Sequence, residues 1–190
     1  MQVNTVTLAS GSRFFIIQDF FEPAEYTSIA ALFDQYHTDH LDWFADPRYS
    51  HAAAGRMVYR GNSAVVAELQ ARASDPSTVE WISNAVGQVL EYQNLDLWLD
   101  LPGYRIEPHY DTPGFEYAVQ IYVPNPNHFF EMLGTCVYTD SAWRDPLFEI
   151  HYRPNRGYLI DQTHTVRHGL NHAIPDQFRR QSVYLRYRVG

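Results

Sequence analysis

Short strand-like segments fill the second half of the chain. From Asn94 the hydrophobic pattern has a period of two residues, with Leu95, Leu97 and Leu99 at alternate positions. Segments of similar character, separated by Pro, Gly, Asn and Asp, are expected to continue as strands at residues 104–110, 117–123, 134–138, 148–152, 157–161, 165–169 and 180–188. Many short strands joined by tight turns are typical of a β-sandwich or jelly roll.

The first half of the chain has a different pattern. Residues 13–20 have the aromatic and β-branched composition of a strand, whereas residues 22–35 and 75–92 carry apolar side chains at helical spacing. Asp75 and Pro76 suit the N-cap and first turn of the second helix. Residues 37–62, between these two helices, have no clear period, and we expect a long loop with short elements there.

The length of the chain, 190 residues, predicts a single domain over residues 1–190. We expect a mainly β fold with flanking helices (α+β). Residues 1–93 would provide helical support and substrate loops, and residues 94–190 would form the jelly-roll core.

The basic residues limit the chemistry that is available. All 14 are Arg, so a Lys Schiff base, a phosphate-loop Lys and a Lys general base are excluded. Fixed positive charge in a site must then come from Arg or from a metal ion. Cys136, the one cysteine, excludes an intramolecular disulfide and a multi-thiolate metal site.

The net charge of −8 disfavours nucleic acid and anionic membranes as partners. No apolar run approaches the roughly 18 residues needed to span a bilayer, and the N-terminal residues lack the pattern of a signal peptide. We therefore expect a cytoplasmic protein without membrane contact, and the sequence leaves its oligomeric state open.

His109 and Asp111 are the first candidates for a metal site. In an extended segment, side chains two residues apart point to the same face, so an imidazole and a carboxylate would lie side by side. Such a pair is common at protein surfaces without any metal. His168, 57 residues after Asp111, offers a third ligand, and His164 on the same strand is its main rival. Two His and one carboxylate with open positions are typical of non-haem Fe(II) oxygenases.

Arg180 follows His168 by twelve residues and opens the last strand. Its planar fork would hold a carboxylate of a diacid through two parallel hydrogen bonds. Strand alternation places Arg180 and Ser182 on one face and Arg179 on the other. We choose Arg180 because the lumen of a barrel covered by helices is its more polar side. Tyr122, on the strand after the candidate ligands, falls on the corresponding polar face.

The chain resembles the Fe(II)/2-oxoglutarate-dependent dioxygenases, in particular the prolyl-hydroxylase-like branch. The resemblance runs from about Leu95 to Tyr187, and its segments are LDLWLDLPGYRIEPHYD, AVQIYVPN, LGTCVY, PNRGYLID, TVRHGL and RRQSVYLRY. It implies a double-stranded β-helix with a metal site formed by His109, Asp111 and His168.

The resemblance also implies the cofactors and the reaction. Arg180 would pair with the distal carboxylate of 2-oxoglutarate, Tyr122 would donate a hydrogen bond to it, and Ser182 would belong to the same cofactor-binding group. Fe(II), 2-oxoglutarate and O2 would together hydroxylate an unactivated C–H, with release of succinate and CO2. The halogenating members have a small residue where this chain has Asp111, so hydroxylation is favoured over chlorination.

The substrate is not determined by these residues. A small molecule or a peptide fits the resemblance, and residues 43–60 and 125–133 are expected to form the variable substrate loops. Arg56, Arg60, His51 and Tyr49 would suit an anionic substrate, or would be ordinary surface residues. Two alternatives stay open: a cupin-like metalloenzyme without 2-oxoglutarate, and a non-catalytic jelly-roll binding module.

Overall fold

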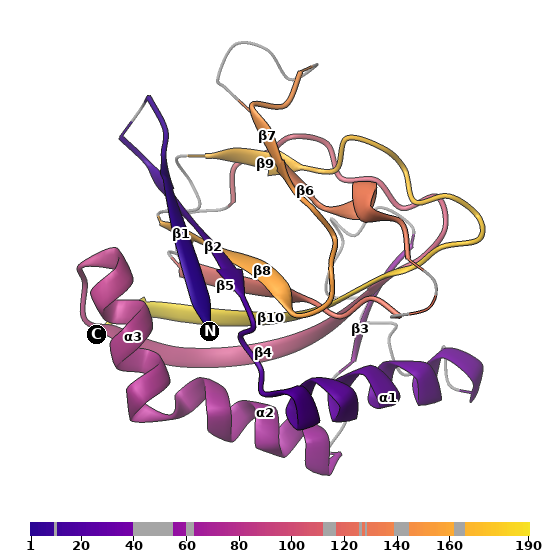
Figure 1. Ribbon diagram of the computed structural model, residues 1–190, viewed down its shortest axis with the longest axis horizontal. Coiled ribbons are helices and arrows are strands. Elements are labelled where there is room, and N and C mark those ends of the chain that lie inside the picture. Colours follow the sequence, from indigo (N-terminus) through magenta and orange to yellow (C-terminus); the bar gives the residue numbers. More distant parts are fainter. Residues whose placement is uncertain are drawn as a thin grey trace.

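The computed structural model describes residues 1–9, 11–39, 55–59, 63–111, 117–125, 127, 129–138, 145–161 and 166–190. Within these ranges the strands form two antiparallel sheets, one of seven strands and one of three. Figure 1 shows three layers, with the helices below the larger sheet and the smaller sheet above it. This arrangement agrees with the jelly-roll core and flanking helices that the sequence predicts.

The seven-stranded sheet has the order β1-β2-β8-β5-β10-β4-β3. Its strands come from both halves of the chain: β1 (Gln2–Thr7), β2 (Arg13–Gln18), β3 (Arg56–Tyr59), β4 (Leu90–Asp100), β5 (Tyr117–Tyr122), β8 (Arg156–Asp161) and β10 (Arg180–Val189). Three of them precede residue 90. The first half of the chain therefore adds strands as well as helices.

The three-stranded sheet has the order β7-β6-β9 and covers the other face of the large sheet. Its strands are β6 (Thr135–Tyr138), β7 (Phe148–Ile150) and β9 (Arg167–Gly169), and the short 3-10 helix η2 (Glu131–Leu133) precedes them.

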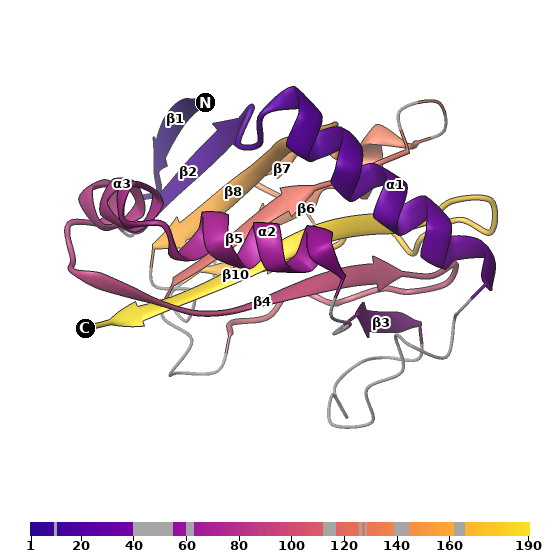
Figure 2. The ribbon, with the colours of Figure 1, turned by 90° about the horizontal axis from the view of Figure 1, so that it is seen from below.

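Three helices, α1 (Pro23–Asp39), α2 (Ala64–Ser74) and α3 (Pro76–Val86), lie together on one face of the large sheet (Figure 2). The helix expected at 75–92 is shorter in the structure because Gly87 adopts the left-handed conformation (φ 74°) that ends it, and Val89 beyond it is 76% exposed. The helix α2 lies between the loop expected at 37–62 and the helix expected at 75–92, in a stretch for which the sequence pattern indicates no element. Its N-cap is Ser63, whose side chain accepts a hydrogen bond from the Val66 amide.

Both faces of the large sheet are buried. Val119 and Ile121 of β5 and Val183 and Leu185 of β10 face the helices and join the larger apolar cluster. The opposite faces of the same strands carry more polar residues, such as Gln120 and Ser182, and point toward the small sheet. The polar lumen predicted for this fold therefore lies between the two sheets.

No helix in the described ranges is long and apolar enough to cross a membrane.

Candidate metal centre

His109 and His168 lie side by side at the edge of the small sheet that β9 forms. The segment 104–110, predicted as a strand, is irregular apart from an isolated antiparallel bridge between these two residues. The bridge has both hydrogen bonds, His109 N–H to His168 O at 3.1 Å and His168 N–H to His109 O at 3.0 Å. Two residues far apart in sequence are thereby fixed side by side through their backbones.

Gly169 allows this close approach. A Cβ at this position would lie 2.8 Å from the carbonyl oxygen of Ile106 and 3.0 Å from that of Glu107. No side chain fits there without moving the backbone that carries His109. The next residue, Leu170, donates its amide to the Ile106 oxygen at 2.9 Å and extends the contact.

The two imidazoles and the Asp111 carboxylate converge on one point. Oδ1 of Asp111 lies 3.5 Å from Nε2 of His109 and 3.6 Å from Nε2 of His168. The ligand atoms of the three residues all lie within 4.8 Å of one another, and no other group of this kind occurs in the part of the chain that the structure describes.

The other ring nitrogens fix the orientation of both imidazoles. His109 Nδ1 lies 2.9 Å from the Glu107 carbonyl oxygen, and His168 Nδ1 lies 3.1 Å from the Val166 carbonyl oxygen. Because a carbonyl only accepts, Nδ1 carries the proton in each ring and Nε2 keeps its lone pair. This is the arrangement of metal-ligating histidines, so the three side chains fit a divalent metal ion.

The protonation tendencies of the two histidines differ. Burial lowers the pKa of His168, and the nearby Asp111 carboxylate offsets this only in part. Burial also opposes the charged form of His109, but its hydrogen bonds to Asp111 and to the Glu107 carbonyl raise its pKa above the ordinary value. In the absence of metal, His109 is therefore the imidazole that holds a proton more readily.

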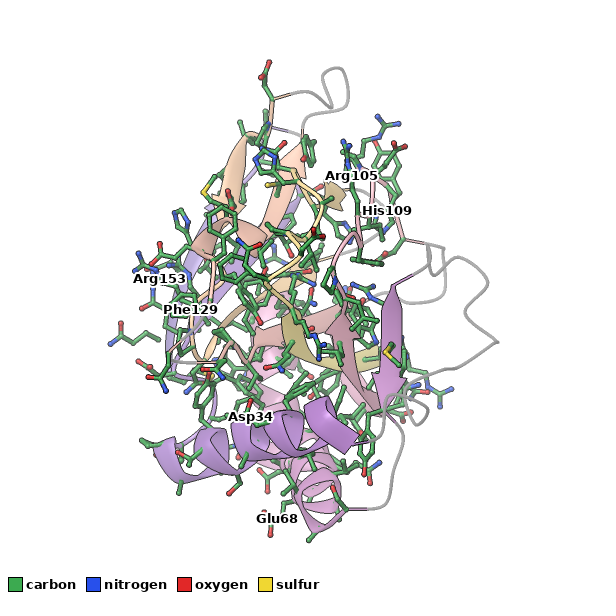
Figure 3. All side chains as sticks on the ribbon, turned by 90° about the vertical axis from the view of Figure 1, so that its right-hand side faces the viewer. Asp34, Glu68, Arg105, His109, Phe129 and Arg153 are labelled. Atoms are coloured by element: carbon green, nitrogen blue, oxygen red, sulfur yellow. The ribbon has the colours of Figure 1, made fainter. Side chains whose placement is uncertain are left out.

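A cavity of about 120 Å³ opens beside the three ligands and extends between the sheets. Figure 3 shows His109 on the side of the large sheet opposite Asp34 and Glu68 of the helices. The apolar part of its lining includes Ile106 and Leu170. The polar part includes Gln120, Thr135, Tyr158 and Arg180, and Arg56 of β3 and Trp98 of β4 also line it.

Arg180 lines this cavity and is 2% exposed. Its guanidinium donates to the Leu133 carbonyl at 2.8 Å, the Asp100 carboxylate at 2.9 Å and the Thr135 hydroxyl at 3.0 Å. Burial alone would lower the pKa of Arg180, but the oxygens of Tyr122 and Asp100 raise it above its usual range. The guanidinium is a fixed cation. Its neighbour Arg179 is not among the residues that line the cavity.

Tyr122 and Ser182 lie behind the cavity wall. The Tyr122 hydroxyl donates to the Thr135 hydroxyl and accepts from the Thr135 amide, both at 2.8 Å. The Ser182 hydroxyl accepts from the Gln120 amide group at 2.8 Å. Both side chains are fully buried, and neither lines the cavity. Each instead contacts a residue that does: Tyr122 contacts Thr135, and Ser182 contacts Gln120.

Several residues of the site carry no signal in the sequence. Thr135 and Tyr158 lie in the segments LGTCVY and PNRGYLID, but nothing in those segments gives them a role at the site; the pairing of β5 with β8 and the position of β6 bring them to Arg180. Asp100 is fully buried, although its place after Leu99 in an alternating strand looks like that of a surface residue. The missing information is its pairing with Arg180 across β4 and β10.

The remaining candidates are His164, the rival metal ligand, and the residues expected to contact the substrate. His164, Arg60, His51 and Tyr49 lie outside the described residues, as do most of the substrate loop expected at 43–60 and residues 126 and 128 of the one expected at 125–133. Arg56 is described, and it lines the cavity.

No model of a known protein family matches the chain, and no curated protein matches it. Solved structures do match. HygX from Streptomyces hygroscopicus with nickel, 2-oxoglutarate and hygromycin B bound has a TM-score of 0.60 and 15% identity, over 92% of this chain and 82% of that one.

Two prolyl hydroxylases are similar to the same degree. A prolyl-4-hydroxylase from Pseudomonas putida has a TM-score of 0.61 and 14% identity, over 93% of this chain and 92% of that chain. A prolyl hydroxylase from Trichoplax adhaerens, in complex with a hypoxia-inducible-factor peptide fragment, has a TM-score of 0.63 and 16% identity, over 92% and 82%. The chain therefore has the fold of the 2-oxoglutarate- and Fe(II)-dependent oxygenases.

Proposed function

We propose that this chain is a non-haem Fe(II)- and 2-oxoglutarate-dependent dioxygenase. It hydroxylates an unactivated C–H of a small-molecule or peptidyl substrate and releases succinate and CO2. The observation that carries the proposal is one cavity that is lined both by His109, Asp111 and His168 and by the buried cation Arg180.

The three ligands would hold Fe(II) through Nε2 of each histidine and through the carboxylate of Asp111. Two neutral imidazoles and one carboxylate leave a net positive charge on the ion and leave positions open for a chelating co-substrate and O2. When bound, iron and 2-oxoglutarate supply the oxidative chemistry, which no side chain of this protein could supply.

The protein positions the co-substrate and excludes water. Arg180 would pair with the distal carboxylate of 2-oxoglutarate, and the hydroxyl groups of Thr135 and Tyr158 line the same cavity. Tyr122 and Ser182 would act through the residues they contact, because Tyr122 holds Thr135 and Ser182 holds Gln120. This refines the expectation that Tyr122 itself would donate to the carboxylate.

The similar solved structures support this assignment of co-substrate and leave the substrate class open. HygX has been solved with 2-oxoglutarate and hygromycin B, and the Trichoplax adhaerens enzyme with a peptide. A small molecule and a peptide are both represented on this fold.

The proposal predicts succinate formation that depends on Asp111. Purified protein with Fe(II), 2-oxoglutarate and air should produce succinate, measured by mass spectrometry, even without substrate at a slow rate. Asp111→Ala should abolish it, because two neutral imidazoles alone lack the charge that holds the ion. Succinate formation at the normal rate by Asp111→Ala would contradict the assignment.

The two alternatives give other results in a metal titration by calorimetry. A cupin-like enzyme would bind metal with an affinity that 2-oxoglutarate does not change, and a binding module would bind no metal.

Substrate identity is then found by screening candidate compounds and peptides for a mass gain of one oxygen.

A further inference from the structure

Three charged residues form a row across neighbouring strands, and two of them, Arg56 and Arg180, line the cavity. In the strand register, Arg56 of β3 pairs with Asp100 of β4, and Asp100 pairs in turn with Arg180 of β10. Directly opposed residues on adjacent strands carry neighbouring side chains. The order across the sheet is therefore cation, anion, cation.

Asp100 is shared between the two guanidinium groups. Its Oδ1 accepts from Arg56 Nε at 2.6 Å, and its Oδ2 accepts from Arg56 Nη2 at 3.0 Å and from Arg180 Nη1 at 2.9 Å. The Asp100 side chain is 0% exposed. A carboxylate with no access to water depends entirely on these two cations for its stability.

Arg56 also contacts two aromatic rings. Its guanidinium carbon lies 4.0 Å from the centre of the Trp98 ring and 4.6 Å from that of Tyr104. Cation–π contacts of this kind help to hold a guanidinium in place. The edge that faces Asp100 takes the carboxylate in a two-point contact.

This arrangement matters for any carboxylate that binds at Arg180. Asp100 already occupies one nitrogen of the Arg180 fork, so it competes with an incoming carboxylate for the same cation. The row has two positive charges and one negative charge, which leaves a single positive charge. Without Arg56, Asp100 would cancel the charge of Arg180, and no net charge would remain for a ligand.

We propose that Arg56 is a positioning residue for 2-oxoglutarate: it holds the Asp100 carboxylate and so leaves the charge of Arg180 for the distal carboxylate of the co-substrate. This inference rests on the proposed function. Arg56 acts through Asp100 and Arg180, and it need not touch the co-substrate.

The proposal predicts that affinity follows the charge of the row. The wild type and the double variant Arg56→Met/Asp100→Asn each have a net charge of +1. Arg56→Met alone has 0, and Asp100→Asn alone has +2. We expect the dissociation constant for 2-oxoglutarate to rise by at least about tenfold in Arg56→Met, to return to within about threefold of wild type in the double variant, and not to rise in Asp100→Asn.

The measurement is calorimetric titration of 2-oxoglutarate into full-length protein loaded with Ni(II) under anaerobic conditions, which reports binding without turnover. Arg56→Lys keeps the charge and should retain most of the affinity. Arg188→Met is the matched control, because Arg188 is exposed and pairs with Glu91 away from the cavity. Metal affinity and melting temperature of each variant are recorded in parallel.

A second ligand separates charge from general damage. 2-Oxopentanoate has the same keto acid group but no distal carboxylate. We expect it to bind more weakly than 2-oxoglutarate, and to have the same dissociation constant in wild type and in Arg56→Met.

Any of three outcomes would overturn the inference. The first is an Arg56→Met protein that binds 2-oxoglutarate within about twofold of wild type. The second is an Arg56→Met defect that Asp100→Asn does not restore, and the third is a defect that extends equally to 2-oxopentanoate. If Arg56→Met fails to fold, loss of affinity in the folded Arg56→Lys protein is the contrary result. A wild type that does not bind 2-oxoglutarate at all would instead refute the proposed function.

Discussion

Each metal-facing imidazole is oriented by the carbonyl of the residue two positions before it. Glu107 serves His109, and Val166 serves His168. Both carbonyls are local in sequence, so the orientation survives as long as the backbone bridge between the two histidines holds. The side chains are preorganised for an ion by short-range geometry.

Replacement of Arg180 should weaken binding of 2-oxoglutarate more than replacement of any other residue that lines the cavity, apart from the metal ligands. We expect Arg180→Ala to reduce the binding free energy of 2-oxoglutarate by about 2–5 kcal/mol, which is roughly 30- to several-thousand-fold in the dissociation constant. The reason is that the distal carboxylate of the co-substrate would be buried without its cation. Arg179→Ala is the matched control, since its side chain does not line the cavity. A larger loss in Arg179→Ala than in Arg180→Ala would refute the assigned role.

Glu149 on β7 gives a prediction about pH that is independent of the metal site. Burial raises the pKa of Glu149, and its Oε1 has no hydrogen-bond partner among the described residues. The folded protein therefore binds this proton more tightly than the unfolded chain does. The stability from this proton is present below the unfolded pKa and is lost as pH rises through the folded pKa.

We expect Glu149→Gln to raise the melting temperature at pH 7.5 by more than at pH 4.5, because Gln removes the cost of the buried charge. Glu91→Gln, at an exposed position, should show no such increase with pH. An equal shift at both pH values, or a lower melting temperature at pH 7.5 alone, would contradict this explanation.

At the scale of elements, the meeting of β9 with the segment before Asp111 determines whether the metal ligands come together. Gly169 is the position at which this contact is tightest, because a Cβ there would lie only 2.8 Å from the Ile106 carbonyl oxygen. The contact joins a strand of the small sheet to an irregular segment, and neither element carries all three ligands.

Gly169→Ala should therefore loosen the metal centre. We expect a loss of about 1–3 kcal/mol in unfolding free energy, the usual cost of overpacking, and weaker binding of Ni(II) or Fe(II). Gly190→Ala is the control, because its nearest neighbour is the flexible Glu91 side chain at the chain end. Wild-type metal affinity in Gly169→Ala would show that the close approach is not needed.

The sequence predicts local elements better than their pairing. It places the strands β5, β6, β8 and β10 within a few residues of their observed bounds, because alternation and turn residues are local signals. The helix expected at 75–92 extends too far because Val89 fits the helical spacing, although Gly87 stops the helix before it. The pattern indicates neither the strand β1 nor the helix α2.

At the site, spacing along the chain points to the residues with charged or ligating groups. His109, Asp111 and His168 lie together, and Arg180 lines the same cavity. The role of Asp100 could not be predicted in this way. It depends on two neighbours that are 44 and 80 residues away in sequence and that come together only through the sheet register.

At the scale of the whole molecule, the layers separate stability from chemistry. The helices and one face of the large sheet form the main apolar core, and the opposite face holds the polar residues around the cavity. A buried charge row and a metal centre are tolerated on that second face because the first supplies most of the apolar burial.

The central claim is that one cavity binds Fe(II) and 2-oxoglutarate together. The most direct test is an anaerobic titration of the full chain with both, followed by visible absorption. We expect a weak charge-transfer band that appears only when both are present and that is lost in Asp111→Ala. Absence of the band in wild type with both ligands, or an undiminished band in Asp111→Ala, would contradict the account.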